Sequence, residues 1–276
     1  MRAYDPLVLV SRQTLMQRVA DYVRTGHVHW TTGEIAIERA PALVRKFARL
    51  YDVDLDRNRR FRAKQLGEAD AVLLLLQAPA GGATLRWVLL VTAGEHPAHQ
   101  LERLDDATTR DGRVHLFDYE LLHMAKPGRR RTPAASQTSG QARERHPDRL
   151  PLQEPEPGRL VLTWRMRAEV YEMWRNRALG AARGHNTFVL ETFLADLYRA
   201  PGFWGIRQQV GKIVGLLRRE HRRRHGSLAG CPKLPRLYYV TRRPNRGVRL
   251  SALLSSQSQR PTPPMAGVEA IRPGGG

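Results

Sequence analysis

Two apolar runs separated by a turn constrain the fold of this chain more than any other feature. Residues 71–77 and 85–92 are rich in leucine and valine, and a Pro-Ala-Gly-Gly sequence at positions 79–82 lies between them. Apolar runs of this length on either side of a glycine-containing turn indicate a β-hairpin. We therefore expect a sheet in the middle of the chain.

Helical and strand-like patterns surround this hairpin. Ser11 can cap a helix that Gly26 ends, because an apolar stripe at helical spacing lies between them. Further helices are expected from Pro41 onward, over residues 54–66, and three times between residues 166 and 225. Further strands are expected at residues 27–30, 35–37, 114–124, 160–164, 237–241 and 248–253.

These patterns predict an α+β protein with a mostly antiparallel sheet. Residues 1–68 form a mainly helical basic section in this prediction, and residues 69–255 form the α+β core. Residues 126–158 are rich in Pro, Ser, Gln and Arg without periodicity, which is typical of a disordered loop. Residues 256–276 are expected to form a disordered tail.

A large excess of positive charge indicates the kind of partner. The 276 residues include 46 Lys and Arg against 26 Asp and Glu, which gives a net charge of +20. Self-repulsion of this size weakens a compact state unless a polyanion offsets it. Nearly all these cations are arginines, whose planar fork matches phosphate. Nucleic acid is the expected partner, and an acidic protein or an anionic membrane surface are the alternatives.

The charge is concentrated between Lys212 and Arg249, where twelve Lys/Arg residues stand against one acid, Glu220. Gly211 and Gly215 fall on the basic side of the preceding helix, where they would let a phosphate backbone or another helix come close. A neighbouring pair of tyrosines could place one ring against a base. The residues expected to bind nucleic acid are Arg57, Arg60, Arg62, Arg207, Lys212, Arg218, Arg222, Arg223, Tyr238, Tyr239, Arg246 and Arg249.

A second cluster suggests a catalytic hypothesis. Arg24, His27, His29 and Arg39 surround a predicted turn. The histidines could accept a proton from a ribose hydroxyl, although packing on the sheet is the interpretation we favour for them. In metal-independent RNA cleavage, His27 or His29 would be the proton acceptor. The residues expected to stabilise charge in the transition state are Arg24, Arg39, Arg242 and Arg243.

Other kinds of chemistry find little support in the sequence. The single cysteine, Cys231, excludes an internal disulfide. His221 and His225 have the spacing of helical metal ligands, but the three arginines between them would repel a cation. Residues 105–120 are acidic but have no diagnostic metal-binding spacing. We expect no metal and no cofactor. A secretory signal and a membrane-length apolar run are both lacking, which predicts a cytoplasmic protein without a membrane partner.

Two resemblances add to this picture. The stretch at residues 85–95, with residues 99–103 and 162–174, resembles proteins of plasmids and integrative elements from GC-rich proteobacteria, over most of residues 15–255. The basic α+β character, with arginine and tyrosine near the C-terminal end, is similar to the CRISPR RNA-processing endonucleases of the RAMP superfamily. Their plasmid-borne type IV form relies on arginines. This resemblance implies a ferredoxin-like sheet and metal-independent cleavage of CRISPR RNA.

The expected function is therefore binding of structured RNA, with an RNA stem-loop favoured over DNA. Processing of that RNA, and association with other subunits of a ribonucleoprotein complex, are possible extensions. The alternative is a DNA-binding regulatory or maintenance factor of a mobile element without enzymatic activity. A protein that only contacts other proteins is a third class.

Overall fold

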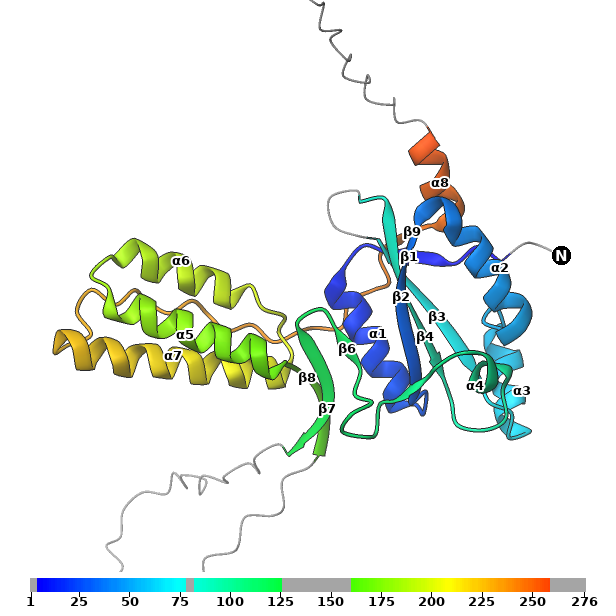
Figure 1. Cartoon of the computed structure of the whole chain (residues 1–276), viewed down its shortest axis with the longest axis horizontal. Coiled ribbons are helices and arrows are strands. Elements are labelled where there is room, and N and C mark those ends of the chain that lie inside the picture. The colour runs from blue at the N-terminus through cyan, green and yellow to red at the C-terminus, as the bar shows by residue number, and fades with distance from the viewer. Residues whose placement is uncertain (1–3, 78–81, 126–159, 259–276) are drawn as a thin grey trace, which may run out of the picture.

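The computed structural model describes residues 4–77, 82–125 and 160–258. One part is built on a six-stranded sheet and the other on three helices, and a three-stranded sheet lies between them (Figure 1). The loop predicted at residues 126–158 lies outside the described residues, and so does the predicted tail from residue 259 onward. The α+β class with a mostly antiparallel sheet is confirmed.

The large sheet contains the predicted hairpin at its centre. Its strand order is β5-β2-β4-β3-β1-β9. These strands are β1 (Leu7–Leu9), β2 (His29–Ala36), β3 (Ala71–Gln77), β4 (Thr84–Val91), β5 (Asp105–Asp106) and β9 (Gly247–Arg249). β3 and β4 are antiparallel in a register that runs from Ala71 opposite Val91 to Gln77 opposite Leu85. Among the pairings of the described strands, β1 with β3 is the parallel one.

Helices cover both faces of this sheet. On one face lies α1 (Arg12–Arg24), whose Leu15, Met16 and Val19 are buried against Val88 and Leu90 of β4. The other face carries α2 (Ala40–Tyr51) and α8 (Leu250–Ser258), which enclose a second core with Leu75 and Leu89. The shorter elements are η1 (Ile37–Arg39), α3 (Arg57–Gln65) and α4 (Pro97–Leu101).

The second part is the predicted set of three helices. They are α5 (Ala168–Arg183), α6 (Thr187–Tyr198) and α7 (Trp204–His225), and they follow the small sheet of β6 (His115–Leu116), β7 (Tyr119–Ala125) and β8 (Leu160–Met166). The apolar stripe expected on α7 is fully buried at Ile206, Val210, Ile213 and Leu217. The period of this stripe therefore predicted its packing correctly.

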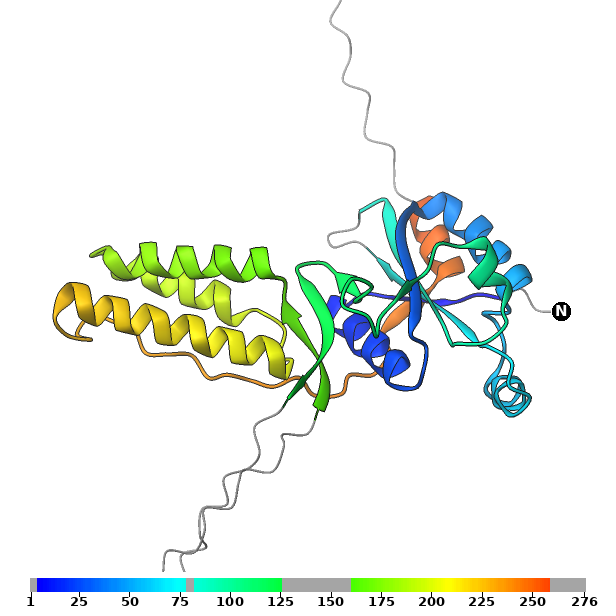
Figure 2. The ribbon, with the colours of Figure 1, turned by 60° about the horizontal axis from the view of Figure 1, so that its bottom comes forward.

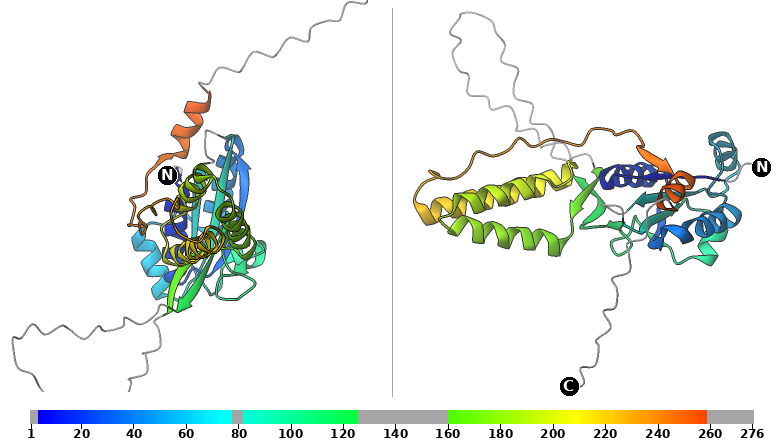
Figure 3. Two further views of the ribbon diagram at one scale, coloured as in Figure 1. Left: turned by 90° about the vertical axis from the view of Figure 1, so that its left-hand side faces the viewer. Right: turned by 90° about the horizontal axis from the view of Figure 1, so that it is seen from above.

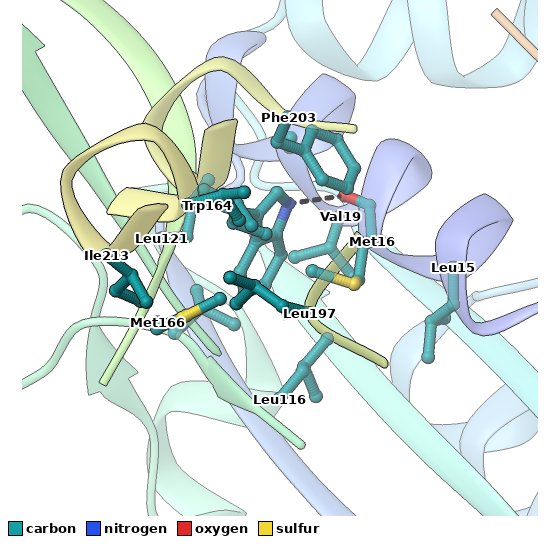
Figure 4. Close-up of a cluster of buried hydrophobic side chains, with 14 of the residues drawn as sticks. Leu15, Met16, Val19, Leu116, Leu121, Trp164, Met166, Leu197, Phe203 and Ile213 are labelled. Atoms are coloured by element: carbon teal, nitrogen blue, oxygen red, sulfur yellow. Dashed lines mark hydrogen bonds between the residues drawn. The ribbon is translucent and has the colours of Figure 1, made fainter. Parts of the chain in front are cut away.

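Trp164 of β8 connects the two parts through one shared core. Its side chain is fully buried, and its indole N–H donates a hydrogen bond of 2.9 Å to the carbonyl of Met16 in α1 (Figure 4). Phe203, which precedes α7, lies in the same cluster. The three-helix part is thus anchored to α1 by packing and by a buried hydrogen bond.

Several expectations need correction. The strands expected at residues 27–30 and 35–37 are one continuous strand, β2, and the strand expected at residues 114–124 is divided into β6 and β7. Residues 237–241 are extended but pair with no strand of the described chain. The strand expected at residues 248–253 ends at Arg249 and gives way to α8, because Leu250 and Leu253 are three residues apart and face one core together. The section at residues 1–68 contains α1, α2 and α3 as expected, but its strands β1 and β2 belong to the same sheet as β3 and β4.

The order of elements also differs from the ferredoxin-like expectation. The chain runs β1-α1-β2-α2-α3-β3-β4 before the shorter elements begin, with η1 between β2 and α2. A ferredoxin-like unit has the order β-α-β-β-α-β. Here the helices between β2 and β3 come before the β3–β4 hairpin, so the connection differs although the class is the same.

Candidate nucleic-acid interface

A long extended segment lies beside α7 and returns to the large sheet. We call residues 227–246 the strap; it starts at the tip of the three-helix part and leads into β9 (Figure 3). Its main chain bonds to the connection between α6 and α7, since the Val240 N–H donates to the Gly202 carbonyl at 2.8 Å. A Cβ at position 202 would lie 2.6 Å from the nitrogen of Val240, so this close approach requires glycine.

A buried arginine on α7 holds the same part of the strap. Arg207 is only 8% exposed, and its Nε donates to the Tyr238 carbonyl at 2.8 Å. Burial lowers the pKa of Arg207 from its ordinary value. Arg207 was expected to contact nucleic acid, and it lies at the interface, but this guanidinium bonds to the main chain of the strap.

The far end of the strap is fixed by two residues of α1. The side chain of Gln17 donates to the Thr241 carbonyl at 2.7 Å and accepts from the Arg243 N–H at 3.1 Å. Arg18 is nine-tenths buried and donates to Asn245 Oδ1 at 2.6 Å and to the Arg243 carbonyl. The sequence interpretation missed both residues. The sequence did contain one signal for Arg18. It directly precedes the apolar residue Val19 in a helix, and an arginine on the apolar side of a helix needs buried hydrogen-bond partners.

Hollows between the strap and its neighbours form a continuous basic surface. One hollow of about 420 Å³ lies between α7 and Tyr239, and another of about 470 Å³ lies toward the tip of α7, with Arg219 lining both. Two smaller hollows continue toward α1, linked by shared lining residues at Arg207 and Val240. We call the lining of these four hollows the basic track. Its cationic residues are Arg24, Arg199, Arg207, Lys212, Arg218, Arg219, Arg222, Arg223, Arg242 and Arg243.

Acidic residues pair with four of these ten cations: Asp21 with Arg24 and Arg242, Asp196 with Arg199, and Glu220 with Arg223. Asp21 is the one acid among the described residues that line it. Within the described chain no ion pair involves Lys212, Arg218, Arg219 or Arg222. These four side chains project from one side of α7 with their charge uncompensated.

Glu220, the single acid of the C-terminal basic region, is paired with two arginines, and one of them, Arg223, lines the track. Its side chain is 10% exposed, and its carboxylate accepts hydrogen bonds from Arg223 at 2.6 Å and from Arg183 of α5 at 2.7 Å. These two arginines lower the pKa of Glu220 to about 2. The acid therefore ties α5 to α7 and leaves the cations on the outer side of α7 free.

The wall of the track combines bare helix backbone with an aromatic ring. A Cβ added to Gly211 would meet nothing within 4 Å, and one added to Gly215 would meet only the end of the Arg219 side chain, at 4.0 Å. Tyr239 faces this wall and is 62% exposed. Tyr238 is 66% exposed, and the guanidinium of Arg236 lies over its ring, 5.7 Å from the ring centre.

The remaining expected binding residues are scattered. Arg223 is paired with Glu220, Arg249 donates to the Asp5 carbonyl at 2.7 Å, and Arg246 is exposed on the strap. The other three, Arg57, Arg60 and Arg62, belong to α3, which lies at the opposite end of the molecule from α7 (Figure 2). The structure thus brings seven of the expected residues together on the track and leaves Arg246, Arg249 and the α3 set outside it. The seven are Arg207, Lys212, Arg218, Arg222, Arg223, Tyr238 and Tyr239.

On α3, Arg60 has a structural role. Its guanidinium donates to the carbonyls of Leu55 at 3.0 Å and Val53 at 2.9 Å, and it lies 3.7 Å from Asp70. Arg62 is exposed. The α3 helix is therefore a separate basic surface, and the two expected regions do not form one interface.

The catalytic candidates divide in the same way. Arg24 and Arg242 converge on Asp21 at 3.0 and 3.4 Å, and Arg243 follows on the strap. Arg39 is exposed and follows the last residue of β2, Ala36, whereas His29 is the first residue of that strand.

Neither histidine lines the hollow of Arg24 and Arg242. His27 is 7% exposed, with Nε2 3.1 Å from Asp70, and His29 packs its ring on His99 with centroids 4.8 Å apart. The favoured interpretation of both histidines as packed residues agrees with these contacts.

Within residues 4–77, 82–125 and 160–258, no three His, Cys, Asp or Glu side chains gather in a way that could hold a metal ion. His221 and His225 contact each other, with ring centroids 4.5 Å apart. No helix in the described part of the chain has the length and apolar character needed to cross a membrane.

Comparisons with protein-family models, with curated proteins and with solved structures found no match for this chain. The fold and the interface define it as an α+β protein with a three-helix extension and a strapped basic track.

Proposed function

We propose that this protein binds nucleic acid along the basic track. The observation that carries the proposal is the set of four uncompensated cations on α7, at Lys212, Arg218, Arg219 and Arg222. A polyanion releases its counterions when such cations neutralise its phosphates, and this release drives binding. Arginine adds bidentate hydrogen bonds to phosphate oxygens. An RNA stem-loop is the first ligand to test, because of the resemblance to RNA-processing proteins of CRISPR systems.

Cleavage is not part of this proposal. Arg24 and Arg242 could hold a phosphate near Asp21, but arginine is a poor base because its pKa is too high. The histidines expected to accept a proton lie outside this hollow. Binding is therefore the function that the geometry supports best, and it is shared by the RNA-binding and DNA-binding alternatives.

Salt dependence tests the proposal directly. Four phosphate contacts give a slope of log affinity against log salt of about −2.8 on a single strand and about −3.6 on duplex DNA. We expect fluorescence anisotropy with a labelled RNA hairpin, a DNA hairpin and single strands to show a slope at least this steep. The double variant Lys212→Gln/Arg219→Gln should reduce the slope on a single strand by about 1.4, because two contacts are lost.

A matched control separates the track from total charge. Arg45 and Arg49 of α2 are exposed, take part in no ion pair of the described chain, and lie on the other side of the large sheet from α1. The variant Arg45→Gln/Arg49→Gln removes the same charge and should leave the slope unchanged. No measurable affinity for any of these ligands would overturn the proposal and indicate an interaction protein. Equal losses in the two double variants would show that binding does not use the track.

A further inference from the structure

Tyr239 is held in a position that suits an aromatic platform. The main-chain groups on both sides of it are bonded, the Tyr238 carbonyl to Arg207 and the Val240 N–H to Gly202, each at 2.8 Å. The ring itself is 62% exposed and makes no ring contact with any described residue. An aromatic side chain on a fixed main chain loses little entropy when a planar group stacks on it.

The α7 wall opposite Tyr239 is shaped for a sugar–phosphate backbone. Gly211 and Gly215 are four residues apart and so lie on one face of the helix, with open space above Gly211. Lys212 and Arg219 border the same hollow. A strand lying there has its phosphates beside cations and its backbone against bare helix, while its bases can turn toward Tyr239.

The dimensions of the hollow favour single strands over duplexes. Its volume of about 420 Å³ is at the small end of the range of small-molecule sites, about 300–1,000 Å³. A base that is paired and stacked inside a duplex cannot present its face to a tyrosine that lines such a hollow. Bases of single strands stack freely on aromatic rings in grooves lined by cations, whatever their sequence.

The length of the α7 section sets the site size. Arg207 and Arg223, the first and last α7 residues in the two larger hollows, are 16 residues apart, which corresponds to about 24 Å of helix. A stacked strand advances about 3.4 Å per nucleotide, so at most about seven nucleotides fit along it.

From these observations we infer that the basic track binds a single strand of about four to seven nucleotides, with one base stacked on Tyr239. This inference rests on the proposed function and names its substrate class. Single-stranded RNA and single-stranded DNA share the phosphates and base faces that the track would contact. A ribose hydroxyl distinguishes them.

Binding of three matched probes tests the inference on the full chain. The probes are a labelled ten-nucleotide RNA strand, the DNA strand of the same sequence, and a blunt RNA duplex that contains it. We expect either single strand, or both, to bind more tightly than the duplex. Tyr239→Leu should weaken strand binding by about 5- to 150-fold, the range for losing one base–aromatic stack. Tyr239→Phe should retain it, because the aromatic face remains.

Phe188→Leu is the matched control, because Phe188 of α6 is also an exposed aromatic side chain but lines none of the four hollows of the track. It should change strand affinity less than Tyr239→Leu does. In Tyr239→Leu the salt slope should stay at its original value, since the phosphate contacts persist, and circular dichroism should show an unchanged melting temperature.

The outcomes separate this inference from the proposed function. Duplex binding as tight as strand binding would overturn the inference while leaving nucleic-acid binding in place. Wild-type affinity in Tyr239→Leu would do the same. Absence of affinity for all three probes would overturn both. A stronger RNA than DNA complex supports the inference and adds a contact to the 2′-hydroxyl.

Discussion

Replacing Gly202 by alanine should displace the strap. An added Cβ would lie 2.6 Å from the nitrogen of Val240 and 2.8 Å from the carbonyl oxygen of Tyr238. Both atoms belong to the main chain, so no side-chain rotation can relieve the contact. The strap would have to move away from the start of α7.

The cost follows from the contacts that this movement disturbs. Overpacking in a closed region costs about 1–3 kcal/mol. The movement also stretches the bond from Val240 to Gly202 and the charged bond from Arg207 to Tyr238, both 2.8 Å long. A bond of the second kind contributes about 1.5–3 kcal/mol. We therefore expect destabilisation of about 3 kcal/mol, which lowers the melting temperature by about 6–12 °C in a domain of this size.

Thermal unfolding followed by circular dichroism measures this shift, and Gly180→Ala is the matched control. Gly180 of α5 is exposed, and a Cβ there meets nothing within 4 Å. Hydrogen exchange should show that Gly202→Ala loses protection at the Val240 amide. A Gly202→Ala protein that melts with the wild type and keeps this amide protected would refute the packing of the strap against Gly202.

Three further predictions concern single contacts. The pKa of Glu220 in the folded state is about 2 against an ordinary 4.5, so its carboxylate stabilises the fold above pH 4.5 and loses this effect as the pH falls toward 2. Urea melts should therefore show Glu220→Gln less stable than wild type at pH 7, with a difference that shrinks below pH 4.5. Gly211→Ala and Gly180→Ala should each stabilise by up to about 1 kcal/mol in urea, because both glycines occupy open helix positions, and only Gly211→Ala should weaken strand binding. Trp164→Phe removes the donor to the buried Met16 carbonyl and should cost about 1–3 kcal/mol in the same assay.

Local periodicity carried most of the fold prediction. The β3–β4 hairpin and the buried face of α7 are local patterns: the first depends on two apolar runs and the turn between them, and the second on hydrophobic spacing. The course of the strap is different, because its partners Gln17 and Arg18 lie more than 220 residues away in sequence. Residues 237–241 have the extended backbone that a strand would have, so the sequence pattern could not reveal that they bond to α1 and α7.

The interface was predicted in part for a similar reason. The sequence located the glycines, Lys212 and the tyrosines, since charge and glycine spacing are visible along one helix. Charge alone does not separate an arginine that faces solvent from one that bonds to buried carbonyls. Arg207 borders the apolar face of α7, and Arg60 lies within a charged helix, yet both bond to main-chain carbonyls. Only the tertiary fold distinguishes them from Arg218 or Arg222.

The strap also determines when the interface can form during synthesis. β1 lies between β3 and β9, and its Leu9 pairs with Gly247, about 240 residues later. At ribosomal rates of about 5–20 residues per second, β9 is synthesised roughly 12–50 s after β1, and until then β1 has no strand on that side. Once β3 and β4 have been made and have paired, the sheet has an open edge at β1 until β9 arrives, and another chain could pair there. In the last part of this interval, after α7 is complete at His225, its arginines are exposed. The hollow opposite Tyr239 does not yet exist at that point, so a nascent chain offers charge without a binding site.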